Sequence, residues 1–115
     1  MKKKYRVELG DGSVVRFGAK GYEDYTTHKD PIRMRSYVVR HGGVVPRRVM
    51  ALEDPLQVHR AMLKVTKSTR ENWSMSGVRT PGFWSRWLLW SHPDIGEAER
   101  MIRSKGVSIN SLKAY

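Results

Sequence analysis

The side chains that carry out acid–base, nucleophilic and metal chemistry are few in this sequence. It contains no cysteine and four histidines, which are His28, His41, His59 and His92. The histidines are not spaced as metal ligands, and without cysteine there is no thiolate zinc site, thiol nucleophile or disulfide framework. No Ser/His/Asp set stands out, and no glycine run matches a P-loop or dinucleotide-binding fingerprint. The sequence therefore predicts a protein that is not an enzyme, with no metal, no cofactor and no small-molecule substrate.

Positive charge is the more abundant chemical resource. Lys and Arg number 22 against 11 Asp and Glu, which gives a formal net charge of +11, and the excess runs through both halves of the chain. A field of this sign attracts nucleic acid, anionic membrane or an acidic protein surface without choosing among them. We expect contacts with an acidic partner at Lys2, Lys3, Lys4, Arg33, Arg35, Arg40, Arg47 and Arg48.

Aromatic residues gather in one short stretch, TPGFWSRWLLW at 80–90, which holds three of the four tryptophans. On a helix, Phe83, Trp87 and Trp90 would share one face, and Trp84 and Leu88 the next. A helix that is apolar nearly all round is normally buried, so we expect this one to form the core. An exposed aromatic platform for a partner remains the alternative.

The elements that position these residues can be read from periodicity and capping signals. Alternation over residues 4–9, a Gly-Asp-Gly turn and the return of Val14 to Phe17 predict an N-terminal hairpin. Helix starts are indicated at Asp30-Pro31, Asp54-Pro55 and Thr80-Pro81, and Ser91 with Asp94 resembles a capping box for a last helix. Residues 42–53 read as a loop, 66–79 as a polar linker, and 107–115 as a tail or an edge strand.

These elements predict a small α+β fold in a single domain, with the N-terminal β-hairpin packed on three to four helices and a buried Trp-rich helix. The expected segments are the hairpin at 1–18, a Tyr/Arg-rich helical block at 19–42, a loop plus amphipathic helix at 43–79, the Trp helix and final helix at 80–106, and the tail at 107–115. The basic N-terminus has no apolar run behind it, and no apolar run is long enough to cross a membrane. We therefore expect no secretory signal and no membrane span.

Two blocks of the chain combine rare residues in long patterns. They are VVRFGAKGYEDYTTHKDPIRMRSYVVRH at 14–41 and GFWSRWLLW at 82–90. Together they resemble a family of small basic virion-associated proteins of large icosahedral nucleocytoplasmic DNA viruses of algae and amoebae, chlorella-virus-like and relatives. The segment 42–67 is longer than the connection expected in that family. The motif residues carried over are Phe17, Gly18, Gly21, Tyr22, Tyr25, His28, Asp30, Tyr37, His41, Phe83, Trp84, Trp87 and Trp90.

The resemblance implies a structural component of the virion rather than an enzyme. A minor capsid or cement protein beneath the major capsid shell would bind acidic surfaces of the major capsid protein and of other minor capsid proteins. DNA or the anionic surface of an inner membrane are further possible partners. A non-specific DNA-binding virion protein that contacts the packaged genome remains the alternative. The expected location is the virion, on the inner face of the capsid shell.

Overall fold

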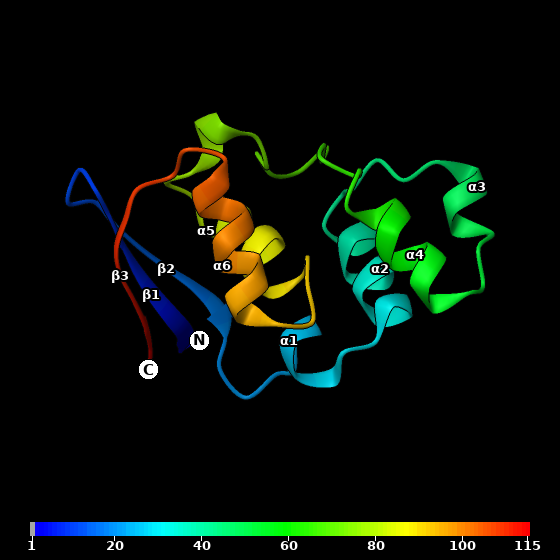
Figure 1. The fold of residues 1–115 in the computed structure, drawn as a ribbon, viewed down its shortest axis with the longest axis horizontal. Helices are drawn as coiled ribbons and strands as arrows, with labels where there is room; N and C mark the ends of the chain where they lie inside the picture. Colours follow the sequence, from blue (N-terminus) through cyan, green and yellow to red (C-terminus); the bar gives the residue numbers. More distant parts are fainter. Residues whose placement is uncertain (1) are drawn as a thin grey trace.

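A computed structural model describes residues 2–115 as an elongated α+β domain of 42 × 28 × 25 Å (Figure 1). Its sheet has three antiparallel strands, β1 (Lys3–Leu9), β2 (Val14–Ala19) and β3 (Ile109–Ala114), in the order β2-β1-β3. The sheet forms one end of the molecule, α2 to α4 form the other, and α5 and α6 lie between them (Figure 1). The helical segments are α1 (Tyr25–His28), α2 (Pro31–Arg40), α3 (Arg47–Met50), α4 (Pro55–Met62), η1 (Met75–Gly77), α5 (Pro81–Trp84), η2 (Ser85–Leu89) and α6 (Ile95–Ser104).

The predicted N-terminal hairpin is confirmed. Tyr5 pairs with Phe17 and Val7 with Val15, so alternate residues of both strands face the core. Val7 and Phe17 are completely buried there. Gly12 adopts φ 87 in the connecting turn, a left-handed conformation that glycine reaches without steric cost.

The C-terminal residues, expected as a tail or an edge strand, form the edge strand β3. It pairs antiparallel with β1, from Tyr5 opposite Ala114 to Leu9 opposite Ile109, with an irregularity between Glu8 and Leu9. Ile109 is buried against the helices. The hairpin is therefore two thirds of a sheet whose central strand is β1.

Capping side chains set the helix starts, and most of the predicted starts are confirmed. Asp30 accepts hydrogen bonds from the backbone at the start of α2, Asp54 does so for α4, and Asp94 for α6. The predicted capping box of Ser91 with Asp94 is wrong. The Ser91 hydroxyl is buried and donates instead to the carbonyl of Trp87, so Asp94 caps α6 alone.

The Trp-rich segment is the core, as predicted, and it is not one regular helix. α5 continues directly into η2, a π-helical turn that packs against β2 and α6. Phe83, Trp84 and Trp87 are each at most 2% exposed, which rules out an aromatic platform made of these rings. Trp90 is half-buried and lies against α2 instead.

A buried arginine stands inside this core. Arg86 is fully buried, and its guanidinium lies 4.5 Å from the Trp87 ring centroid. It donates hydrogen bonds to the carbonyls of Met62, Val65 and Trp90 at 2.6–3.1 Å. Arg86 thereby ties the end of α4 to the end of η2 through backbone acceptors.

The segment 42–53, expected as a loop, contains the short helix α3, which packs on α4. Arg35 of α2 holds it in place, because its Nη1 donates to the carbonyls of Val49 at 2.8 Å and Leu52 at 2.9 Å. No helix among residues 2–115 is long and apolar enough to cross a membrane.

Candidate functional site

A cleft of about 740 Å³ lies between the sheet end of the molecule and α2. Its walls come from β1, the end of β2, the β2–α1 loop, α2, and the α5–η2 segment. We call it the central cleft. It is lined by Lys3, Lys4, Gly18, Ala19, Tyr22, Glu23, Asp24, Arg33, Ser36, Tyr37, Arg40, His41, Glu71, Pro81, Gly82, Ser85, Leu89 and Trp90.

The cleft brings together residues from both sequence blocks that carry the family resemblance. From the first block come Gly18, Tyr22, Tyr37 and His41, and from the second comes Trp90. Four of the cations expected to meet an acidic partner also line it, namely Lys3, Lys4, Arg33 and Arg40.

Two of the four cations form ion pairs within the protein. Lys4 Nζ lies 2.7 Å from a carboxylate oxygen of Asp24, which is buried and also caps α1. Arg33 pairs with Glu23 at 3.7 Å on the exposed rim. Within residues 2–115, Lys3 and Arg40 have no carboxylate at ion-pair distance, so their charge is directed at solvent.

Stacked rings form the wall of the cleft near α2. The Tyr37 ring lies 4.1 Å from that of Trp90, at 3° between planes, and 4.0 Å from the His41 ring. Burial raises the pKa of the Tyr37 hydroxyl, and the nearby Glu71 carboxylate raises it further. Tyr37 therefore stays protonated and can act as a hydrogen-bond donor over the whole physiological range.

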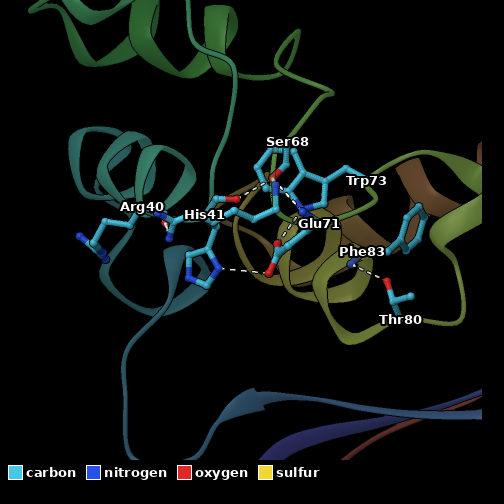
Figure 2. A network of polar contacts seen from close by, with 8 residues as sticks. Arg40, His41, Ser68, Glu71, Trp73, Thr80 and Phe83 are labelled. Atoms are coloured by element: carbon cyan, nitrogen blue, oxygen red, sulfur yellow. Dashed lines mark hydrogen bonds and ion pairs between the residues drawn. The ribbon is translucent and has the colours of Figure 1, made fainter.

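A carboxylate fixes the orientation of His41 at the edge of this wall (Figure 2). The Nδ1 atom of His41 lies 3.2 Å from Glu71 Oε2, and the other carboxylate oxygen of Glu71 accepts a hydrogen bond from Trp73 Nε1 at 2.8 Å. The Ser68 hydroxyl donates to the His41 carbonyl and accepts from the backbone N–H of Glu71. With Nδ1–H directed at Glu71, the neutral ring keeps Nε2 free to accept a hydrogen bond from a ligand.

Close packing leaves little room for change beside Glu71. A β-carbon at Gly82 would lie 2.8 Å from Glu71 Cδ, and one at Gly43 would lie 2.7 Å from the Val38 carbonyl oxygen. Glycine at 82 lets α5 lie against Glu71, and glycine at 43 lets the chain turn back closely over the last turn of α2.

Several residues predicted from sequence lie outside the cleft. Arg35 donates hydrogen bonds to backbone carbonyls of the α3 segment, while Lys2, Arg47 and Arg48 are exposed elsewhere. Phe17 packs on Trp84 with ring centroids 5.9 Å apart, in the core with Phe83 and Trp87. Gly21 adopts φ 91 in the loop that leads to α1.

Two more motif residues, Tyr25 and His28, belong to a cluster of rings between α1 and α4. Tyr25 is buried, and its hydroxyl lies 2.8 Å from His59 Nδ1. His28 Nδ1 accepts from the backbone N–H of Asp30 at 3.0 Å. The His59 and His92 rings are 5.7 Å apart. Among residues 2–115, no group of three or more His, Cys, Asp or Glu is arranged to hold a metal ion.

Sequence reasoning missed Glu71 and Trp73, because the segment 66–79 has no period and reads as a polar linker. Trp73 is in fact 3% exposed, and its carbonyl accepts from Trp87 Nε1 at 2.8 Å. A tryptophan inside an otherwise polar stretch was the available signal that this linker is packed against the core.

Comparison with known proteins gives one match. Residues 1–41 match a family described as a family of unknown function, DUF5754. No curated protein and no solved structure matches the chain. Twelve of the 18 residues that line the central cleft lie within the matched segment. The segment that is similar to this family thus supplies most of the cleft wall.

Proposed function

We propose that the protein is a non-enzymatic binding protein whose central cleft holds an acidic surface of a protein partner. The observation that carries the proposal is the pair of cations Lys3 and Arg40, which stand at the cleft without a carboxylate partner among residues 2–115. In the setting suggested by the resemblance to virion proteins, the chain is a minor capsid or cement protein of a large DNA virus. Its partners there are the major capsid protein and other minor capsid proteins.

The distribution of the acidic residues supports this reading. Within residues 2–115, carboxylates take part in six ion pairs or histidine contacts, and Asp30, Asp54 and Asp94 are used as helix caps. Little negative charge is left to neutralise the outward-facing Lys and Arg. The net charge of +11 therefore acts on whatever approaches the protein.

The cleft favours isolated carboxylates over a row of phosphates. Its lining contains Glu23, Asp24 and Glu71, which would repel the closely spaced charges of a nucleic-acid backbone. A single Asp or Glu side chain of a partner can instead pass between these three carboxylates and reach Lys3 or Arg40. The half-buried Trp90 ring offers apolar contact beside it, which suits a protein surface.

Calorimetric titration with the major capsid protein encoded by the same genome tests the proposal. The Lys3→Gln/Arg40→Gln variant should bind at least about tenfold more weakly, because two cations facing the partner are lost. The control is Arg100→Gln/Lys113→Gln, which removes the same charge from exposed positions on α6 and β3. Equal affinities of the two variants, or no binding by the wild type, would contradict the proposal.

A DNA-binding virion protein is the second candidate function. The observation in its favour is a set of exposed cations on and after α3 and α4 that form no ion pair within residues 2–115, namely Arg47, Arg48, Arg60, Lys64 and Lys67. DNA binding by these residues should weaken steeply as salt is raised, in proportion to the phosphates contacted. A binding isotherm that is unchanged between low and physiological salt would eliminate this candidate.

A further inference from the structure

A second cavity, of about 410 Å³, lies at the opposite end of the molecule from the sheet, between α3 and α4. We call it the α3–α4 groove. It is lined by Val44, Pro46, Arg48, Val49, Gln57, Arg60, Ala61, Lys64 and Val65. Every one of these residues lies outside the segment 1–41 that matches the family, and none lines the central cleft.

The groove has an apolar floor. Val49 and Val65 are buried at its base, and Pro46 and Ala61 add apolar surface beside them. Val44, which is 57% exposed, adds apolar surface at the edge of the groove. Apolar surface of this kind is stabilised by burial against another apolar group.

The charged residues that line the groove are all cations. Arg48 comes from α3, while Arg60 of α4 and Lys64 just beyond it lie four residues apart on the same side. No carboxylate lines the groove, and none of these three cations forms an ion pair within residues 2–115. Their charge is therefore uncompensated around an apolar centre.

Internal contacts keep the two walls in position. Arg35 fixes α3 through the carbonyls of Val49 and Leu52, and Asp54 caps α4 through the backbone N–H of Gln57. A groove that is already formed loses less conformational entropy on binding than one that must be assembled. The α3–α4 groove thus has the geometry of a preformed docking site.

The residues that line the groove favour one class of anionic partner over the others. It has no Phe, Tyr, Trp or His in its lining, so unpaired bases would find no ring on which to stack. A duplex backbone would use the cations but leave the apolar floor empty. A protein segment that carries an apolar side chain between carboxylates satisfies both features.

We propose that the α3–α4 groove docks an acidic amphipathic helix of a protein partner. An apolar residue of that helix fills the floor over Val49 and Val65, and flanking Asp or Glu side chains pair with Arg48, Arg60 and Lys64. This inference rests on the proposed binding function and assigns it a second contact, separate from the central cleft. It also gives a role to the segment 42–67 that departs from the family pattern.

The test uses the full chain and a labelled helical peptide of about 14 residues that alternates pairs of glutamate and leucine. Its counterpart has serine in place of every leucine and the same charge. Wild type should bind the leucine peptide at least about tenfold more tightly than the serine peptide, because only leucine fills the floor. Amide NMR shifts should concentrate at Val44, Val49, Ala61 and Val65.

Charge variants then locate the site. Arg60→Gln/Lys64→Gln should lose at least about tenfold in affinity for the leucine peptide, while Arg100→Gln/Lys113→Gln should stay within about twofold. Lys3→Gln/Arg40→Gln should keep wild-type affinity for the leucine peptide, because both substitutions lie in the central cleft and not in the groove. Failure of this inference is thereby distinguishable from failure of the proposed function.

Three outcomes would overturn the inference. The first is equal binding of the leucine and serine peptides, which would mean attraction by charge alone. The second is shifts that map to the central cleft or to the sheet. The third is tighter binding of duplex DNA or of phosphatidylserine vesicles that displaces the peptide from the groove, which would assign the surface to a phosphate-bearing partner.

Discussion

Among single residues, Trp87 contributes to the fold through packing, a hydrogen bond and a cation–π contact. It is 2% exposed, its Nε1 donates to the Trp73 carbonyl, and Lys105 Nζ lies 4.3 Å from its ring centroid. Trp87→Ala should lower the free energy of unfolding by about 3–5 kcal/mol, through lost burial and a cavity. Urea unfolding measures this, with Tyr22→Ala as the exposed control. A loss below about 0.5 kcal/mol would contradict burial of the ring.

Arg86 is the residue whose role is least visible in the sequence. Burial lowers its pKa to about 10 from an ordinary 12.5, a cost of about 3 kcal/mol to the charged form. Its three hydrogen bonds to carbonyls contribute about 1.5–3 kcal/mol each, because the donor is charged. The three bonds offset this cost and join the ends of α4 and η2, while the buried Arg86 Nε has no hydrogen-bond partner within residues 2–115.

Replacing Arg86 therefore tests whether those carbonyls depend on it. Arg86→Met keeps most of the side-chain volume but leaves three buried carbonyls without their donor, and it should destabilise the fold by about 2 kcal/mol or more. Arg100→Met on the exposed side of α6 should change stability by less than about 0.5 kcal/mol. An Arg86→Met protein as stable as wild type in urea would show that water replaces the guanidinium.

Among the elements, β3 is the one whose importance the sequence understates. It covers the edge of β1 opposite β2 and places Ile109 in the core. Deleting residues 109–115 should lower stability by more than about 3 kcal/mol, because a strand edge and apolar core surface become exposed. Deleting Tyr115 alone, which is 55% exposed, should cost less than about 1 kcal/mol. A shortened chain with an unchanged urea midpoint would contradict the pairing of β3 with β1.

Local signals explain which elements were predictable. A cap and its proline lie within one turn of each other, so the starts at Asp30, Asp54 and Thr80 could be predicted from sequence alone. Pairing of β3 depends on a partner about a hundred residues away, and its alternation is weak. The π-helical turn of η2 was also unpredictable, because apolar residues on every side leave no period to follow.

The central cleft was partly predictable for the same reason. Tyr37, His41 and Trp90 stood out through the family resemblance, although nothing in their spacing indicated that their rings stack. Glu71 comes from a segment without a pattern, and its contact with His41 is set by tertiary packing. The groove between α3 and α4 was not predicted, since α3 itself was taken for loop.

For the whole molecule, partly buried histidines couple stability to pH. Burial lowers the pKa of His28, His59 and His92 below the ordinary 6.5, and His28 Nε2 has no hydrogen-bond partner within residues 2–115. As the pH falls through this value, the unfolded chain binds protons that the folded chain does not. Stability must then decrease, and it levels off once the folded-state pKa values have been passed.

Urea unfolding at pH values from about 7.5 to about 5.5, where carboxylates remain ionised, measures this dependence. We expect the free energy of unfolding to fall steadily across the range. A variant with glutamine at His28, His59 and His92 should show a flatter profile. Stability that rises toward acid pH in the wild type would contradict the lowered pKa values of these histidines.

The proposed location of the protein in a virion can be tested directly by quantitative mass spectrometry of purified particles of the proposed large DNA virus, separated by detergent and salt into shell and genome fractions. We expect recovery with the major capsid protein in a fixed ratio. Recovery with the genome, released by nuclease or high salt, would contradict the cleft assignment in favour of DNA binding, and absence from the particles would contradict the structural role altogether.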